Sequence, residues 1–545
     1  MAELRRGASD MPKCGLAEKI AVVGEIRERL VTHATEWIEV SCAFKEVVTA
    51  AQRSEEILAG PSTTARYLTL LIRSLASIKR TGRPSVPARI TTLSDGRLRI
   101  PVFPAQGVYD SLLFSGLRAE AWMQPDVTRS TIHGDRLAAV LDPPSPAPIT
   151  LVLGAGNVSA IPLTDSLTKL FHEGQVVLLK MNPVNEALTP VFRKMLAPII
   201  DRGWMQIVTG GADIGQAAMQ IDDVSTVHIT GSHHTHDKIV WGASDDEQEQ
   251  RQAADTPLLE KPITSELGNV TPWIIVPGSY SNKQLRFQAT NVAASMTNNA
   301  GFNCLTTRLI ITHKGWSQRE EFLDGVEASL ARTPQRSPYY PGTAARFERF
   351  TGAPPEAAED GSFPWLLMRD VNPEEKPLLF QDESFCSACV EIQLEANSPE
   401  EFLQRAADFC NTRLFGTLCA TITMPNPFRR QQQQLVEDVV SGLNYGTVCI
   451  NQWPGLVFGL MTPPWGAAPG SSLKDIQSGC GDVHNLYFLD KHEKIVLRGP
   501  LCNFPKPIWF PSHRRAEKIA LKLIRFYDRP ALHRLPGLFL PALLG

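Results

Sequence analysis

The stretch Ile149-Thr150-Leu151-Val152-Leu153-Gly154-Ala155-Gly156-Asn157 opens the part of the chain that decides its fold. Its first five residues are a short apolar run that ends at glycine, a pattern typical of a buried strand. A helical pattern follows, in which Leu163, Leu167 and Leu170 recur on one face. This alternation favours right-handed crossovers and a parallel sheet, whose ligands bind beyond the carboxyl ends of the strands.

The alternation of strands and helices continues on both sides of an acidic, glutamine-rich segment at residues 244–255. Before that segment, further strands are predicted at Val176–Leu179, Met205–Val208 and Ser225–Thr230. After it, a second alternating region extends over about residues 267–455. The predicted fold class is therefore α/β, with parallel sheets.

Composition narrows the class of protein. The chain has 545 residues, which is long enough for two or more domains. Its net charge of −3 argues against a general nucleic-acid binder, so we expect no nucleic-acid partner. Ten cysteines at irregular spacing do not indicate a disulfide framework. Because the chain shows no signal-peptide pattern and no apolar run of about 20 residues, we expect a cytoplasmic protein.

One of these cysteines, Cys304, lies at a predicted junction between a helix and a strand. Ser281 is typical of the start of that helix, Gly301 stands at its end, and Arg308–Thr312 has the pattern of a buried strand. A thiol at such a junction can be held rigidly with its sulfur facing a cleft. Because buried free cysteine is usually inert, a role as nucleophile depends on other groups at fixed distances.

Several short motifs follow one another in an order that resembles the aldehyde dehydrogenase superfamily, over about residues 150–490. These motifs are Leu153–Val158, Glu266–Asn269, Gly301–Cys304 and Asp382–Phe385. The resemblance implies that Cys304 is the nucleophile and that Glu266 activates the water that hydrolyses a thioester. It also implies that the side-chain amide of Asn157 donates to the oxyanion. Taken alone, each of these residues is compatible with an ordinary structural role.

The resemblance also implies a site for NAD or NADP. Its residues hold the adenosine ribose, form two glycine turns near the pyrophosphate, and contact the nicotinamide ribose and ring. In this sequence they are Lys180, Gly211, Gly215, Gly231, Ser232, Glu383 and Phe385.

This sequence departs from the superfamily's motifs at several positions. Phe302 stands where glutamine is usual, and Asn269 replaces the second glycine of a Glu-Leu-Gly-Gly motif. One residue fewer separates Cys304 from Arg308. Pro183 replaces a glutamate that contacts the ribose 2′-hydroxyl, so the choice between NAD and NADP stays open.

Three histidines, His233, His234 and His236, stand at the start of the helix after the second glycine turn. They suggest a metal site, but their spacing is poor for converging ligands and no carboxylate cluster accompanies them. We therefore expect no bound metal, with the histidines either near the cofactor phosphates or solvated.

By resemblance, the chain divides into two Rossmann-like parallel-sheet domains, a small β oligomerisation element and a C-terminal extension. The oligomerisation strands imply a homodimer or homotetramer. The extension combines basic and apolar residues, which fits either a peripheral membrane contact or packing on the body of the protein. The expected dinucleotide-binding domain comprises residues 1–127 and 147–266, and the catalytic domain comprises residues 267–455. The oligomerisation strands are expected at 128–146 and 484–498, and the C-terminal extension at 499–545.

The function that follows from the resemblance is NAD(P)-dependent oxidation of an aldehyde to a carboxylic acid, through a thiohemiacetal and a thioester on Cys304. One alternative is a CoA-dependent acylating reductase of the same superfamily, which would pass the acyl group to CoA. Glu266 argues against it, because hydrolysis is the step that needs a base. The other alternative is a catalytically inactive scaffold. The sequence does not identify the aldehyde.

Overall fold

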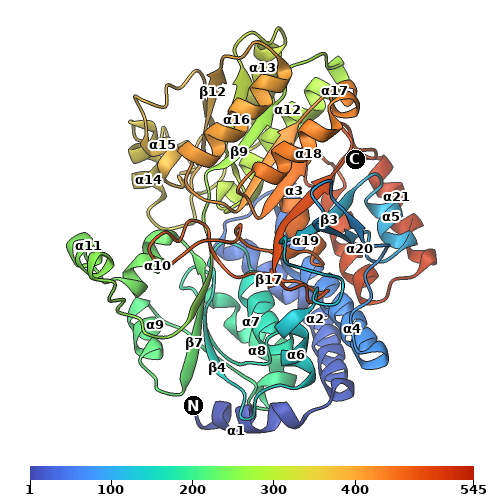
Figure 1. The fold of residues 1–545 in the computed structure, drawn as a ribbon, viewed down its shortest axis with the longest axis vertical. Coiled ribbons are helices and arrows are strands. Elements are labelled where there is room, and N and C mark those ends of the chain that lie inside the picture. The colour runs from blue at the N-terminus through green and yellow to red at the C-terminus, as the bar shows by residue number, and fades with distance from the viewer.

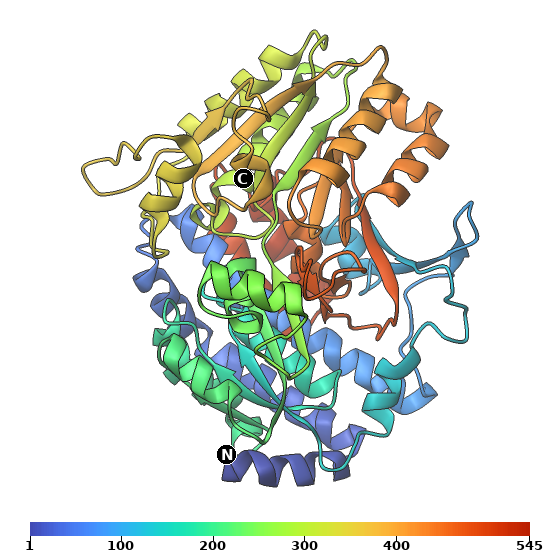
Figure 2. The ribbon, with the colours of Figure 1, turned by 60° about the vertical axis from the view of Figure 1, so that its left-hand side comes forward.

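The computed structural model describes residues 1–545, and two sheets organise the chain. Figure 1 shows one sheet in the lower half, around β4 and β7, and the other in the upper half, around β9 and β12. Figure 2 shows the same two halves from the side, blue to green below and yellow to orange above. Parallel strands form most of both sheets, so the predicted α/β class is confirmed.

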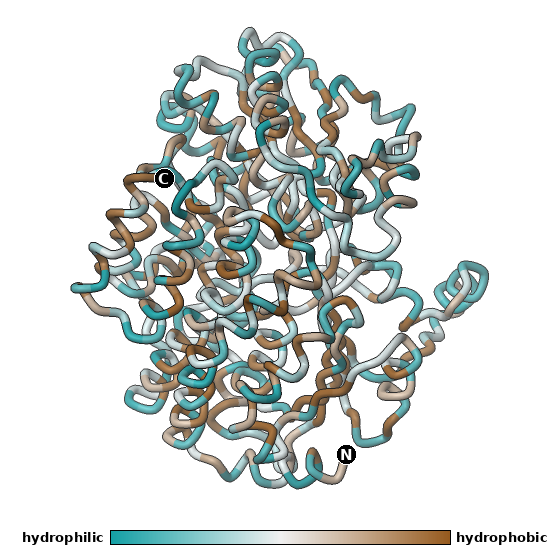
Figure 3. The backbone as a smooth tube through the Cα atoms, turned by 180° about the vertical axis from the view of Figure 1, so that it is seen from behind, coloured by the Kyte–Doolittle hydropathy of each residue, from teal (hydrophilic) through white to brown (hydrophobic).

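The first sheet has the strand order β16-β8-β7-β4-β5-β6, and all of its strands except β16 run parallel. Its strands are β4 (Ile149–Leu153), β5 (Val176–Lys180), β6 (Met205–Val208), β7 (Val224–Gly231), β8 (Ile263–Leu267) and β16 (Gly479–Cys480). The helical segments between them are α7 (Ile161–Phe171), η3 (Glu186–Leu188), α8 (Thr189–Ile200), α9 (Ala212–Met219), α10 (His233–Val240) and α11 (Asp245–Ala254). Helix α11 buries no residue and projects from the body as a hydrophilic coil (Figure 3).

The N-terminal helices belong to the same half of the molecule. Apolar residues such as Leu30 and Leu71 share one core with Leu151 and Leu167 of the first sheet and its helix. Figure 1 shows α2 and α4 in the lower half, with α7 and α8. These N-terminal segments are α1 (Ala2–Asp10), η1 (Met11–Lys13), α2 (Leu16–Phe44), α3 (Ala50–Ile57), η2 (Leu58–Ser62) and α4 (Thr63–Thr81).

The second sheet has the order β1-β2-β3-β18-β14-β13-β9-β10-β12-β11. Its strands are β9 (Thr271–Ile275), β10 (Thr307–His313), β11 (Leu366–Met368), β12 (Ala388–Leu394), β13 (Cys419–Thr423), β14 (Thr447–Ile450), β18 (His492–Arg498), β1 (Thr91–Thr92), β2 (Leu98–Phe103) and β3 (Arg118–Met123). Its helical segments are α12 (Asn282–Thr297), η4 (Asn298–Gly301), α13 (Arg319–Ala331), α14 (Thr343–Thr351), α15 (Leu378–Gln381), α16 (Pro399–Arg413), α17 (Asn426–Gln431), α18 (Gln433–Gly442) and α19 (Gly455–Leu460). A short antiparallel pair, β15 (Pro464–Trp465) with β17 (Val483–His484), lies outside both sheets.

Two predicted boundaries are wrong. Residues 91–123, expected in the dinucleotide domain, supply β1, β2, helix α5 (Val108–Leu113) and β3, and the three strands extend the second sheet. Residues 128–146 form no strand but contain helix α6 (Gly134–Leu141), followed by a proline-rich segment that lacks the N–H groups a strand ladder needs. Strand β18 pairs with β14 and β3 of its own chain, so both of its edges are occupied. Oligomerisation through 484–498 stays a prediction.

The C-terminal extension packs on the N-terminal helices. Helix α20 (Ala516–Asp528) lies against α3 and α4, and buries Ile519, Leu523 and Ile524 in the core of the first sheet. The apolar face that suggested a membrane contact is therefore covered over this helix. After η5 (Leu532–Arg534), helix α21 (Pro536–Leu543) leaves Leu540 and Leu543 exposed, and a membrane contact there stays a prediction. No helix has both the length and the apolar character needed to span a bilayer.

Candidate active site

A cavity of about 760 Å³ lies where the carboxyl ends of the first sheet's parallel strands face the second sheet's domain. This is the position expected for a ligand of a parallel sheet. All of the predicted site residues except Gly211 line it: Asn157, Lys180, Gly215, Gly231, Ser232, Glu266, Cys304, Glu383 and Phe385. The structure thus brings together residues that lie more than 220 positions apart in the sequence.

The nucleophile loop, residues 298–304, is held in an unusual backbone conformation. Asn299 and Ala300 have φ angles of 52° and 59°, and Gly301 has 80°. A Cβ on Gly301 would lie 2.9 Å from the carbonyl oxygen of Cys386, so glycine is required there. The guanidinium of Arg308 donates to the carbonyl oxygens of both Gly301 and Cys386, at 2.6 and 2.5 Å. These contacts fix the loop that carries the cysteine.

The thiol of Cys304 points at a carboxylate. Its Sγ–H donates to Oε1 of Glu266 at 3.3 Å, and Nε1 of Trp465 donates to the same oxygen at 3.0 Å. Burial raises the pKa of Glu266 to about 7, against the opposing effect of the Trp465 hydrogen bond. Burial also raises the pKa of Cys304 well above its usual value, and the carboxylates of Glu266 and Glu383 raise it further. The thiol is therefore protonated at rest, with a base of suitable pKa beside it.

Asn157 lies in the loop after β4 and contacts the nucleophile loop directly. Its Nδ2 donates to the carbonyl oxygen of Phe302 at 2.9 Å. Its own carbonyl oxygen accepts from Nζ of Lys45 at 2.7 Å and from Nδ2 of Asn299 at 3.0 Å. An amide in this position lines the cavity beside the thiol, where an oxyanion would form.

Lys45 is a site residue that the sequence did not reveal. Its side chain is only 2% exposed, and its Nζ donates to Oε1 of Glu56 at 2.9 Å and to Oδ1 of Asn299 at 3.0 Å. Neighbouring Glu55 on α3 accepts from the backbone N–H of Asn299 at 3.0 Å. The N-terminal helices therefore support the nucleophile loop. No local motif marks Lys45, because its partners lie 112 and 254 positions away.

The opposite side of the cavity carries the predicted dinucleotide residues. Lys180 ends β5, Gly215 lies on α9, and Gly231 and Ser232 join β7 to α10. Ser232 caps α10 by accepting from the backbone N–H of Thr235 at 3.2 Å, which leaves the first amides of that helix near the cavity. Gly211 caps α9 and does not itself line the cavity.

Glu383 and Phe385 reach the cavity from the second domain. Glu383 is half-buried, its Oε1 is buried without a hydrogen-bond partner, and burial raises its pKa to about 8. A Cβ on Gly268 would lie 2.0 Å from Oε2 of Glu383, so the glycine makes room for this carboxylate. The ring of Phe385 lies 5.6 Å from that of Phe302, and both face Tyr340.

Comparisons with known proteins agree with this geometry. Residues 144–345 match the aldehyde dehydrogenase family. The structure of an NAD-dependent aldehyde dehydrogenase from Sinorhizobium meliloti matches with a TM-score of 0.60 and 14% identity, covering 91% of this chain and 84% of that one. Lactaldehyde dehydrogenase from Escherichia coli matches with a TM-score of 0.58 and 15% identity, covering 90% and 89%.

Residues 144–345 therefore match the aldehyde dehydrogenase family, and the chain has the fold of aldehyde dehydrogenases. The identities to these structures are low, and no curated protein matches its sequence.

Two departures from the superfamily's motifs have a structural explanation in this chain. Phe302 packs in an aromatic cluster with Tyr339, Tyr340 and Phe385, so its ring occupies apolar surroundings that suit no polar side chain. Asn269 donates to the carbonyl oxygen of Cys419 at 2.8 Å, and so ties the end of β8 to the second sheet. Both side chains contact other segments of the site.

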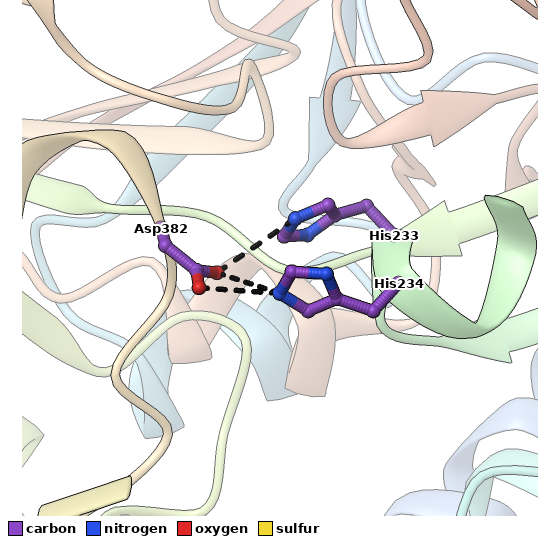
Figure 4. A group of neighbouring side chains, drawn as sticks. All are labelled: His233, His234 and Asp382. Carbon is purple, nitrogen blue, oxygen red and sulfur yellow. Dashed lines mark hydrogen bonds and ion pairs between the residues drawn. The ribbon is translucent and has the colours of Figure 1, made fainter. Parts of the chain in front are cut away.

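The histidines near the cavity have a partner that the sequence did not indicate. Asp382 lies 3.7 Å from Nε2 of His233 and 3.1 Å from Nε2 of His234 (Figure 4). The sequence indicated no carboxylate cluster with these histidines, but one carboxylate, that of Asp382, reaches them from the other domain, 148 positions from His234. His236 is buried and apart, and its Nδ1 lies 3.1 Å from Asp237.

Proposed function

We propose that this protein oxidises an aldehyde to a carboxylic acid, with NAD or NADP as the second substrate and an acyl thioester on Cys304 as the intermediate. The observation that carries the proposal is the 3.3 Å contact between the Cys304 thiol and the Glu266 carboxylate in a cavity shared by two Rossmann-like domains. The match of residues 144–345 to the aldehyde dehydrogenase family supports the same chemistry. Relatives of the same fold include an indole-3-acetaldehyde dehydrogenase complexed with NAD+ and a glyceraldehyde-3-phosphate dehydrogenase complexed with NADP.

The residues of the cavity fit a dinucleotide. Its diphosphate would meet the N-terminus of α10 beside Gly231 and Ser232, where unpaired backbone amides favour an anion. Lys180 would hold the adenosine ribose, and the unpartnered Oε1 of Glu383 would accept from the nicotinamide ribose. When bound, the nicotinamide ring supplies the acceptor for the hydride that leaves the aldehyde carbon. Because Pro183 lines the cavity in place of a carboxylate, a 2′-phosphate is not repelled, and both cofactors remain candidates.

The first chemical step uses the contact between Cys304 and Glu266. Glu266 accepts the thiol proton, and the resulting thiolate adds to the carbonyl carbon of the aldehyde. The C–S bond forms as the carbonyl π electrons move to oxygen. That oxyanion accepts hydrogen bonds from Nδ2 of Asn157 and the backbone N–H of Cys304. Loss of hydride from the adduct leaves a thioester.

The second step returns the enzyme to its starting state. Glu266 first releases the thiol proton to solvent. It then takes a proton from water, whose oxygen attacks the thioester carbon and expels the Cys304 thiolate. The acid leaves, and the thiol regains its proton. A buried carboxyl with a pKa of about 7 serves both proton transfers near neutral pH. This role for Glu266 favours water over CoA as the acyl acceptor.

The test is a panel of aldehydes assayed by NADH and NADPH absorbance, with wild-type protein and the Cys304→Ser variant. We expect oxidation with at least one aldehyde and no detectable oxidation by the variant. The matched control is Cys502→Ser, a thiol outside the cavity, which should keep full activity. Product analysis with and without CoA separates hydrolysis from acyl transfer. Full activity of the Cys304→Ser variant would refute the proposal.

A further inference from the structure

Two histidines and a carboxylate converge at the rim of the cavity. One potential ligand atom from each of His233, His234 and Asp382 lies within 4.8 Å of the others. Oδ1 of Asp382 is 3.7 Å from Nε2 of His233 and 3.3 Å from Nε2 of His234. Figure 4 shows both imidazole rings turning the same edge towards the carboxylate. No step of the proposed aldehyde oxidation uses these three groups.

The spacing of these atoms suits a small divalent cation. Zinc bound to imidazole nitrogen and carboxylate oxygen at about 2.0–2.2 Å in a tetrahedral site requires ligand atoms about 3.3–3.5 Å apart. The two distances to Oδ1 bracket this value. His234 is 55% exposed in its side chain, so its ring can rotate to complete the set. His233 and Asp382 are 15% and 9% exposed and are already held in place.

We propose that His233, His234 and Asp382 bind a divalent transition-metal ion of the zinc class at the rim of the cavity. The two histidines belong to α10 of the first domain, whereas Asp382 follows α15 of the second. The bound ion therefore ties the two domains together across the cavity. Two histidines and one carboxylate leave a fourth position open, as in catalytic zinc sites. Water fills this position, or a phosphate oxygen of a dinucleotide if the proposed function holds.

The guanidinium of Arg349 also contacts Asp382, on the carboxylate oxygen that the metal does not need. Nη2 of Arg349 lies 3.2 Å from Oδ2 of Asp382 and already neutralises that oxygen. A metal on Oδ1 leaves this ion pair intact, because the two cations then occupy different oxygens. Arg349 acts in that arrangement as the outer partner that orients a metal-binding carboxylate.

The experiment titrates full-length protein carrying Cys304→Ser with zinc chloride by isothermal calorimetry, without aldehyde or dinucleotide. The serine removes the thiol of the same cavity as a competing ligand. We expect one equivalent of zinc, and affinity at least tenfold weaker in His233→Asn and in Asp382→Asn, since even outer-partner changes at metal sites cost about 10–100-fold. His234→Asn is the third variant, for which we expect the same loss of affinity. Because the His234 side chain is exposed, this substitution leaves the buried core untouched. His533→Asn, exposed on the C-terminal extension, is the matched control and should bind zinc as before.

Cobalt(II) gives an independent readout. We expect visible d–d bands of a tetrahedral ion without the charge-transfer band of a thiolate ligand. The absence of that band is informative, because nine other cysteines remain in the serine variant as competing ligands. The proposal is overturned if zinc does not bind, if the three variants bind it as tightly as the parent, or if cobalt reports a thiolate. None of these outcomes depends on aldehyde oxidation, so the site and the proposed function fail separately.

Discussion

The two ends of the cavity are built in different ways. At the chemical end, Cys304 is oriented by partners that come from distant parts of the chain: Glu266 is 38 positions away, and the Lys45 that supports its loop is 254 positions from Asn299. At the dinucleotide end, local turns position the residues, as in the contact between Ser232 and Thr235. The difference teaches that the chemical end is sensitive to remote substitutions, whereas the dinucleotide end depends on backbone shape.

This contrast predicts where each substitution acts. Changes at the chemical end should lower kcat, and changes at the dinucleotide end should raise the KM for the cofactor.

The largest effect is expected at the catalytic base, Glu266. Glu266→Gln should lower kcat by about 10²–10⁴-fold, because the amide cannot accept a proton from thiol or water. Steady-state rates with saturating cofactor measure this decrease in kcat. A decrease of less than tenfold would show that Glu266 is not the catalytic base.

The next largest effect is expected at Lys45. Lys45→Met should lower kcat by about 10²-fold, because Asn157 and Asn299 lose the ammonium that positions them. It should also cost about 3–5 kcal/mol of unfolding free energy, since Glu56 is left buried without its partner. The double variant Lys45→Met with Glu56→Gln is the matched control: stability should recover in denaturant titrations, but kcat should not. Recovery of both would show that Lys45 serves stability alone.

A smaller effect, on the other side of the comparison, is expected from Gly268→Ala. The added Cβ would meet Oε2 of Glu383 and displace the carboxylate that faces the nicotinamide ribose in our proposal. We expect the KM for the dinucleotide to rise about tenfold. Gly24→Ala in α2, where an added Cβ meets open space, should change nothing. Equal kinetics for the two variants would contradict the role assigned to Glu383.

The smallest effect is a shift in pH dependence. The indole N–H of Trp465 stabilises the charged form of Glu266 and so lowers its pKa, against the stronger effect of burial. Activity of the wild type should rise with pH through about 7, as Glu266 loses its proton. In Trp465→Phe the rise should move to higher pH, with a severalfold loss of rate at pH 7. A shift to lower pH would contradict this hydrogen bond's role.

The sequence predicted the fold where local patterns are strong. The apolar run at Ile149–Leu153 and the alternation after it gave the parallel sheet, because buried strands and amphipathic helices leave distinct periodicities. It failed at residues 128–146, where a helix replaces the expected strand. It also misassigned residues 91–123, since a strand's sequence does not show which sheet it will join.

The residues of the candidate site were likewise predicted where short motifs mark them and missed elsewhere. Cys304, Glu266 and Asn157 were predicted from short motifs, and the structure brings all three to one cavity. Lys45 and Asp382 were missed, because each contributes through a contact that only the folded chain creates. A lysine at the end of a helix and an aspartate in a loop have no local signature, so long-range contacts of this kind lie beyond motif analysis.

The central claim is that Cys304 carries the acyl group and Glu266 releases it. The most direct measurement is the intact mass of the wild-type protein, quenched with acid during turnover of an aldehyde that it oxidises and the matching dinucleotide. We predict an added mass equal to the acyl group, which the Cys304→Ser substitution abolishes. Reduced dinucleotide formed without any acylated protein, or acylation that persists without Cys304, would contradict the account.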